Sequence, residues 1–370
     1  MATTAPAFRL LASLSPLLLG LIVALGATTG ANAQAWDKNA WLKKLEEAKK
    51  AEGNRMIQYD AQPNYANWGG VTLYFKKNYG VDIPPDMKGS SATMAALVKE
   101  KASTVADVAY YNAVIAAQAG EQKGVHQPYK PVGWDKIPAE CKDPEGRWFC
   151  VHQGVISFIV NTDALKKKNL PVPQCWKDLL KPEYKGLVAY DDPTVHGTAW
   201  EAIFAANIAM GGSTKDTKPG IEYLKKLDAN ILRYSRDTSY NPSLRGELPI
   251  WLNADGNGYK MKWEDGGPIE VVIPCEGTIA TPLAMGMVTW AKRPLLAKAY
   301  LDWLLSPEAQ GIWADSYWLP VIPEYMTENA KKKMVPLHGD YKSIKAVPLL
   351  DKLPMIDTYK KEWLEQVKKQ

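Results

Sequence analysis

Polar and aromatic side chains that could bind a small charged molecule collect in the segment after the first predicted strand. Asp60, Tyr65, Asn67 and Trp68 all lie in this segment, directly after the strand expected over 54–59. A carboxylate can pair with an amine, and an aromatic ring can hold the same cation on its face. Because the segment is polar, aromatic and Gly-rich, it suits a binding loop better than a core. The chemistry that it indicates is noncovalent recognition.

Further polar groups follow later strands. Asp107 and Tyr110 belong to a short strand, Tyr240 lies beside another, and Asn253 with Asp255 forms a polar turn after a third. In open α/β sheets, ligands bind beyond the carboxyl ends of the strands, so we expect these groups to face one crevice. Asp-Gly and Asn-Gly pairs are also ordinary turn formers, which leaves a purely structural role open for the turn.

Two predicted helix starts add donors for an anion. Ser90 and Ser91 precede the first of these helices, while Thr194, His196 and Thr198 surround the start of the second. The free N–H groups of a first helical turn can hold a phosphate or a carboxylate, and nearby hydroxyls can help. The alternative is that these residues only cap their helices.

Motifs of covalent catalysis are not recognisable in the chain. There is no G-x-S-x-G sequence, and the Ser90-Ser91 pair has no evident base. The four histidines are scattered and no C-x-x-C occurs, so a zinc site is not expected. We therefore expect a binding protein that needs no cofactor, with an exported hydrolase or lyase as the alternative.

Strands and helices alternate around these groups. The apolar, β-branched run 155–160 predicts a buried strand, a Lys-rich helix follows over 164–168, and 186–190 predicts a second strand. A polar loop then leads to a helix that starts near Gly197. This order is typical of an α/β layer.

Two pieces of this region, FIVNTDAL and LPVPQCWKDLLKPEYKGLVAYDDPTVHGTAW, resemble the extracellular solute-binding proteins of ABC importers. The group that they match carries ferric iron, polyamines, thiamine or aminophosphonates. The resemblance implies a type II, two-lobed periplasmic-binding-protein fold, in which each lobe is a mixed sheet flanked by helices and hinge strands join the lobes. It also implies a small-molecule ligand and, as partner, an ABC permease in the inner membrane. We expect a monomer.

The resemblance also divides the mature chain. It places 34–157 in lobe 1, 158–279 in lobe 2, and 280–370 in the return to lobe 1 with the C-terminal helices. The charged tail is expected to pack on the first lobe.

Four residues lie in segments that correspond to motifs of the family. His196 stands where members often have the Ser of a Ser-Gly-Thr sequence, and it could donate to an anion or respond to pH. Asn253 and Asp255 lie in the turn where members carry a ligand-reading Asp or Asn. Glu276 belongs to a stretch similar to the IPxEG sequence of the return strand.

The ligand itself is predicted less well. Iron-binding members keep adjacent tyrosines where this chain has Tyr317-Trp318, and polyamine binders keep an acidic cluster where it has 278–282 without a carboxylate. The helix starts favour an anionic group, whereas the carboxylates and aromatic rings favour an amine. We expect an amine or a zwitterion such as an aminophosphonate or a polyamine, with ferric iron as the alternative.

Residues 1–33 have the layout of a secretory signal peptide, and a membrane anchor is the alternative. Arg9 is the only charge, 10–25 is mostly apolar, and Ala31-Asn32-Ala33 forms a cleavage site before Gln34. A periplasmic protein that starts at about Gln34 is expected. Nucleic-acid binding is not expected, because the net charge is only +5 and no Lys/Arg cluster is interleaved with aromatic residues.

Export to an oxidising compartment permits disulfides. Cys141 and Cys150 bracket a loop with Pro and Gly, and they form the pair that we predict to be bridged. Cys175 and Cys275 are far apart in sequence, so spacing alone does not indicate whether they pair.

Overall fold

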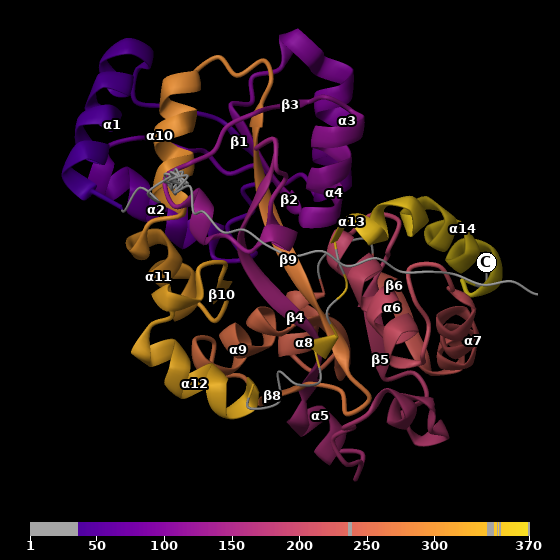
Figure 1. Ribbon diagram of the computed structural model, residues 1–370. Coiled ribbons are helices and arrows are strands. Elements are labelled where there is room, and N and C mark those ends of the chain that lie inside the picture. The colour runs from indigo at the N-terminus through magenta and orange to yellow at the C-terminus, as the bar shows by residue number, and fades with distance from the viewer. Residues whose placement is uncertain (1–35, 236–238, 339–343, 346, 348, 369–370) are drawn as a thin grey trace, which may run out of the picture. The chain divides into compact units, whose positions relative to one another are not determined.

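The computed structural model describes residues 36–235, 239–338, 344–345, 347 and 349–368. The predicted signal peptide and its cleavage before Gln34 lie outside these described residues. Across the described part of the chain, no helix combines the length and the apolar character that a bilayer crossing requires. Helices pack on both sides of a mixed sheet (Figure 1).

The sheet follows the order β1-β2-β9-β4-β7-β5-β6, and β3, β8, β10 and β11 pair with β9 or β4 off this path. β1 and β2 are parallel, as are β5 with β6, β5 with β7 and β9 with β11, whereas β4 and β9 run antiparallel to each other and to β7 and β2. The strands are β1 Gln58–Tyr59, β2 Val108–Asn112, β3 His126–Gln127, β4 Phe149–Asn161, β5 Val188–Asp191, β6 Ile231–Ser235, β7 Ile250–Ala254, β8 Ile269–Val272, β9 Thr278–Val288, β10 Leu319–Pro320 and β11 Ile344–Lys345.

Two long strands, β4 and β9, run side by side through the middle of the fold (Figure 1). The first part of β4, up to Val155, pairs with β9, and from Ile156 onward β4 pairs with β7 and β8. A Cβ at Gly154 would lie 3.0 Å from the Trp318 ring, so only glycine fits where the partners change. β4 thus joins a first part of the sheet (β1, β2, β3, β9, β10) to a second part (β5 to β8).

Most of the predicted helices and strands are present, and side-chain caps fix several helix starts. Asp37 accepts a hydrogen bond from the N–H of Asn39 (2.9 Å), and Ser306 accepts one from Ala309 (3.2 Å). The α-helices are α1 Lys38–Glu52, α2 Trp68–Tyr79, α3 Ser90–Glu100, α4 Ala113–Ala117, α5 Thr162–Lys166, α6 Gly197–Ala209, α7 Lys218–Leu227, α8 Tyr240–Leu244, α9 Asp255–Trp263, α10 Pro294–Leu304, α11 Pro307–Asp315, α12 Glu328–His338, α13 Leu349–Lys352 and α14 Ile356–Gln366.

The polar turn predicted after β7 is the start of a helix instead. α9 begins at Asp255, whose carboxylate accepts a hydrogen bond from the Gly256 N–H (2.9 Å). Gly256 is required for packing, because a Cβ there would lie 2.8 Å from the Trp318 ring. The Asp-Gly and Asn-Gly pairs therefore start a close-packed helix, which local turn preferences do not reveal.

The predicted Cys141–Cys150 disulfide is wrong: both residues are buried free thiols, and Cys175 is bonded to Cys275. The loop does fold back, since the bridge between Lys142 and Phe149 places Cys141 opposite Cys150. Cβ atoms of opposite residues lie about 4.5–5.5 Å apart, whereas a disulfide needs about 3.5–4.5 Å. Burial and the neighbouring Cys141 raise the pKa of Cys150 well above its ordinary value, which keeps the thiol protonated.

The C-terminal helix packs on the second part of the fold, and not on the first as expected. The indole N–H of Trp363 in α14 donates to the Tyr190 hydroxyl of β5 (2.9 Å). The Tyr359 hydroxyl, also in α14, donates to the carbonyl of Ile203 in α6 (3.1 Å). Both rings are buried, so the apolar face of α14 completes the core around β5 and α6.

Candidate functional site

Asp60 begins the loop after β1 and is buried. Its carboxylate accepts a hydrogen bond from the Gln62 side chain (2.7 Å), and its own N–H donates to Asp86 (3.0 Å). Burial, with a smaller contribution from the charge of Asp86, raises its pKa well above the ordinary value. Its φ of 62° is left-handed, a conformation that aspartate tolerates and that often occurs at binding sites. The carboxyl group is held in place without a basic hydrogen-bond partner among its described contacts.

Tyr65 connects the two parts of the fold. Its hydroxyl lies 2.9 Å from Oγ1 of Thr198 in the first turn of α6, and its ring packs edge-on against Trp318 (5.6 Å between centroids). Burial raises the pKa of Tyr65, and the charges of Asp60 and Asp191 raise it further. The hydroxyl therefore lies within electrostatic range of one carboxylate from each part.

Asp191, which the sequence analysis did not select, is the buried carboxylate of the second part. It ends β5 and accepts hydrogen bonds from the Ser239 hydroxyl (2.5 Å) and from the side chain of Asn253 (3.4 Å). Burial raises its pKa to about 6, although the Ser239 hydrogen bond and the charge of His196 oppose the increase. Asp191 ends β5 at its carboxyl end, where the rule that ligands lie beyond strand ends would have selected it, whereas Asp107 directly precedes β2.

The two predicted helix starts lie close to each other. A Cβ at Gly197, the first residue of α6, would lie 2.7 Å from the Asn112 side chain, and one at Gly89 would lie 4.0 Å from the Val195 carbonyl. Ser90 in the first turn of α3 accepts a hydrogen bond from the Asn112 N–H (2.9 Å). Neither α3 nor α6 is capped by the side chain of its N-cap residue. Their first N–H groups are therefore available to an anion.

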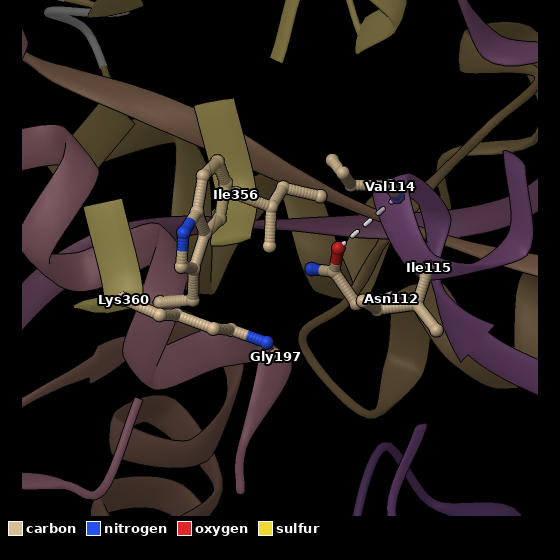
Figure 2. A pocket seen from close by; sticks show the side chains of 7 residues that line it. Asn112, Val114, Ile115, Gly197, Ile356 and Lys360 are labelled. Atoms are coloured by element: carbon tan, nitrogen blue, oxygen red, sulfur yellow. Dashed lines mark hydrogen bonds between the residues drawn. The ribbon is translucent and has the colours of Figure 1, made fainter. Parts of the chain in front are cut away.

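A small pocket lies beside this junction. Figure 2 shows Lys360 of α14 extending across it toward Gly197, opposite Asn112. Burial lowers the pKa of Lys360, although the charges of Asp357 and Asp192 oppose the decrease. No sequence signal indicated this lysine, because α14 reaches the pocket only through the tertiary fold. The pocket is lined by Asn112, Val114, Ile115, Gly197, Trp200, Ile356 and Lys360.

Aromatic residues form the floor behind Asp60. The Tyr110 hydroxyl is 2.9 Å from Nε2 of His152, and Trp68 packs edge-on against the Tyr110 ring (4.8 Å). Burial and the charges of Tyr65 and Asp60 raise the pKa of Tyr110, so this hydroxyl stays neutral. Tyr110 and Trp68 thus support the candidate site from the core of the first part.

Two of the proposed acidic residues hold the frame of the fold. Asp107 accepts hydrogen bonds from the N–H groups of Ile57 (2.9 Å) and Arg293 (2.8 Å) and forms an ion pair with the Arg293 guanidinium (3.0 Å). Asp255 accepts the Val155 N–H of β4 (2.8 Å). The oxygen atoms of Asp107 are occupied by backbone and Arg293 contacts, which corrects its assignment to the crevice.

Glu276 lies away from the other candidates, beside the disulfide. Its carboxylate accepts hydrogen bonds from the N–H groups of Trp176 (2.7 Å) and Lys177 (3.0 Å), at the start of a 3₁₀ helix. Among the described residues, Cys175, Cys275 and Glu276 form the one cluster of His, Cys, Asp or Glu side chains close enough for a metal. Because both sulfur atoms are bonded to each other, this cluster is unsuited to metal binding.

The remaining candidates lie at the periphery. The Tyr240 hydroxyl donates to Asp265 (2.5 Å), outside the group around Asp191. The Asn67 side chain donates to the Ser316 hydroxyl. Thr194 donates to Asp192 (2.5 Å), and Ser91 is half-buried in the first turn of α3. The structure thus gathers a different set of candidates around the Tyr65–Thr198 contact. This set consists of Asp60, Tyr65, Ser90, Tyr110, His196, Thr198 and Asn253, together with Asp191.

Comparisons with known proteins agree with this architecture. The family model described as bacterial extracellular solute-binding protein matches residues 103–345. An uncharacterized protein of Haemophilus influenzae is 30% identical over 268 residues, which cover 70% of this chain and 76% of the relative. The spermidine/putrescine-binding periplasmic protein of Salmonella typhimurium is 30% identical over 172 residues, 45% of this chain and only 47% of that protein.

Two further proteins are similar to this chain over a longer part of it than the spermidine/putrescine-binding protein is. A putative 2-aminoethylphosphonate-binding periplasmic protein of Salmonella paratyphi A is 25% identical and covers 67% of this chain and 72% of its own. The periplasmic binding protein AfuA of Actinobacillus pleuropneumoniae, solved with fructose-6-phosphate, superimposes with a TM-score of 0.73 and 25% identity, over 85% of this chain and 98% of its own. The two parts that β4 joins are the lobes of a type II periplasmic-binding-protein fold. The chain belongs to the bacterial extracellular solute-binding proteins and is a substrate-binding protein of an ABC transporter.

Proposed function

We propose that this protein captures a small zwitterion, with an ammonium group and an anionic group, and delivers it to an ABC permease in the inner membrane. The observation that carries the proposal is the position of Tyr65, within range of the buried carboxylates of both Asp60 and Asp191. One carboxylate comes from each lobe, so a ligand that contacts both favours the closed state. We propose that the ligand binds where β1 and β5 end and the loops after them begin.

The carboxylates account for the cationic group. Burial raises the pKa of both Asp60 and Asp191 by more than the nearby charges of Lys88 and His196 lower it, so each carboxylate still lacks full compensation by a positive charge. An ammonium group would supply that charge and would reverse the increase. Tyr65 and Trp318 present aromatic rings beside it, and a ring face adds a cation–π attraction.

The helix starts account for the anionic group. α3 and α6 direct their first N–H groups toward the same junction, and a helix N-terminus favours negative charge. Lys360 adds an ammonium group at the edge of this junction. A relative that matches 67% of this chain is described as a putative 2-aminoethylphosphonate-binding protein, and 2-aminoethylphosphonate combines both groups. A polyamine would meet the carboxylates but would leave the helix starts without a partner.

Ferric iron fits these residues less well. At the position of the paired tyrosines, the Tyr317 hydroxyl accepts a hydrogen bond from the Lys333 ammonium (3.0 Å), and Trp318 offers no oxygen. The positive charge of this ammonium group would repel a ferric ion from the same oxygen. We therefore rank a ferric ligand below a zwitterion.

We also propose that the protein has no catalytic step. The nearest hydroxyl to a helix start, that of Ser90, is held by the Asn112 N–H and takes part in no nucleophile–base pair that the described contacts reveal. The protein is proposed to act as a periplasmic monomer after cleavage near Gln34, without binding nucleic acid. We propose that one lobe comprises 34–157 and most of 280–370. The other lobe comprises 158–279, and α14 packs on it.

A thermal-shift and calorimetry series tests the proposal. The probes are 2-aminoethylphosphonate, putrescine, inorganic phosphate, fructose 6-phosphate and ferric citrate, each with the mature protein. A ligand at 100 times its Kd stabilises the folded state by about 2.7 kcal/mol, so a true ligand should raise Tm clearly. We expect the aminophosphonate to give the largest shift and to remain chemically unchanged after incubation. A shift with ferric citrate alone, or conversion of a probe, would reject the proposal.

A further inference from the structure

The segment 191–196 between β5 and α6, called here the binding loop, is organised by its second residue. Asp192 is buried, and one of its carboxylate oxygens accepts hydrogen bonds from the N–H (2.8 Å) and the hydroxyl (2.5 Å) of Thr194. Its carbonyl accepts the His196 N–H (2.9 Å), and its own N–H donates to the Ser235 carbonyl (2.7 Å). The conformation of the loop therefore depends on the placement of this one side chain.

The second oxygen of Asp192 contacts the far end of the chain. It lies 3.1 Å from Nζ of Lys368, which follows α14, and the Lys368 side chain is 35% exposed against 1% for Asp192. Burial raises the pKa of Asp192, but hydrogen bonds from Thr194 and Lys368 outweigh it and hold the pKa below its ordinary value. Lys368 thus supplies the charge that keeps a buried carboxylate ionised beside the binding loop.

Lys368 has a fixed position because α14 is anchored to the same lobe as the loop. Trp363 donates to the hydroxyl of Tyr190, the residue before Asp191, and Glu362 accepts a hydrogen bond from the Thr217 hydroxyl (2.6 Å). In Figure 1, α14 lies beside α6 and α7. An ammonium group placed by a packed helix can orient a loop, whereas one on a free tail would not.

We propose that Lys368 is a positioning residue for ligand binding, which acts through Asp192 on the binding loop. The proposal rests on the proposed function of Asp191 and of the start of α6. With Asp192 paired to Lys368 and Thr194, its charge is compensated within the lobe, so that Asp191 is the carboxylate left for the ligand. Lys368, which follows α14, would then support the binding site without contacting the ligand.

The test compares five single variants of the mature protein. Lys368→Met removes the ammonium group, Lys368→Arg retains it, and Asp192→Asn removes its partner. Lys361→Met is the matched control, because Lys361 lies on the exposed face of α14 and, among the described residues, its ammonium group pairs with Glu365 (3.8 Å). Thr217→Val is a second control, since it loosens the anchor of α14 without touching the loop.

Two readouts separate loop position from general stability. The ring resonances of His196, assigned with His196→Gln, report on the loop without any ligand. Calorimetry with 2-aminoethylphosphonate and with putrescine gives Kd. We expect Lys368→Met to shift the His196 resonances and to weaken binding about tenfold, the effect of one charge-assisted hydrogen bond. Lys368→Arg should restore both, and Lys361→Met should change neither.

The combined variant Lys368→Met/Asp192→Asn should bind no more weakly than Asp192→Asn alone, because the two residues act as one unit. If the wild-type protein binds neither probe, the proposed ligand class fails, and the His196 resonances still decide the role of Lys368. Unchanged resonances in Lys368→Met would overturn the inference. So would an equal loss of affinity in Thr217→Val, which would indicate only a loosened helix.

Discussion

The hydroxyl of Tyr65, in the loop after β1, lies 2.9 Å from Oγ1 of Thr198, in the first turn of α6. These residues are 133 positions apart in the sequence and belong to different lobes. Their hydrogen bond forms only when the lobes approach, so it contributes to the closed state and not to either lobe alone. It also lies between Asp60 and Asp191, whose charges both act on Tyr65.

Tyr65→Phe should therefore weaken ligand binding about three- to tenfold, because one hydrogen bond of the closed state, worth about 1 kcal/mol, is lost. The Tm of the unliganded protein should change little. Calorimetry with the best probe measures the first effect and a thermal melt the second. Tyr325→Phe is the control, since its hydroxyl accepts a hydrogen bond from the exposed Lys136. Equal affinities of Tyr65→Phe and the wild type would show that the contact does not contribute to closure.

Asp60 and Asp107 should respond in opposite ways to the same substitution. Asp107→Asn removes an ionised acceptor from two backbone N–H groups and from Arg293, so we expect the unfolding free energy to fall by about 2–4 kcal/mol. Asp60→Asn retains an acceptor for Gln62 and removes a carboxyl group whose burial opposes ionisation, so stability should stay within about 1 kcal/mol.

Ligand affinity should show the reverse order, with a loss of at least about tenfold for Asp60→Asn and little change for Asp107→Asn. Urea denaturation and calorimetry on both variants provide the four values. If Asp107→Asn is as stable as the wild type but no longer binds the ligand, Asp107 belongs to the binding site.

The alternation of strands and helices, the helix starts and the Tyr65 loop were predictable because they depend on local patterns. A polar residue at a strand end, by contrast, looks the same in sequence whether it faces a ligand or a backbone N–H. Asp107 and Asp191 illustrate this, since the first was selected and the second was not. Only tertiary contacts distinguish them: Arg293 reaches Asp107, whereas Ser239 and Asn253 surround Asp191.

Long-range pairings were beyond the sequence for the same reason. Lys368 meets Asp192 across 176 residues, and Cys175 meets Cys275 across 100. No spacing rule connects such positions. The short spacing of Cys141 and Cys150 led to a wrong disulfide prediction, since the two residues lie opposite each other on a folded-back loop and remain thiols.

The raised pKa of Asp191 predicts a pH dependence of stability. Its pKa is about 6 in the folded state against an ordinary value of 3.8, so the folded protein holds the proton more tightly than the unfolded chain. The stabilisation is complete below pH 3.8 and is lost as the pH rises through 6. The difference of about 2 in pKa corresponds to about 3 kcal/mol.

Urea denaturation of the wild type and of Asp191→Asn between pH 4 and 7.5 should show this difference, with the wild type losing stability relative to the variant as the pH rises. An ammonium ligand favours the ionised carboxylate, so its affinity should increase over the same range. A constant difference between the two proteins across the range would contradict the assignment.

The cysteine pairing gives a prediction that is independent of the ligand. The Cys175–Cys275 bond closes a loop of about 100 residues, and removal of such a disulfide costs about 2–5 kcal/mol. Cys175→Ser/Cys275→Ser should therefore lower Tm without changing Kd, because the bond lies beside Glu276 and not at the binding loop. Cys141→Ala/Cys150→Ala should leave a bridged protein. In denaturant without reductant, iodoacetamide should label two cysteines of the wild type, and peptide mapping should identify them as Cys141 and Cys150. Labelling of Cys175 or Cys275 instead would reverse the assignment.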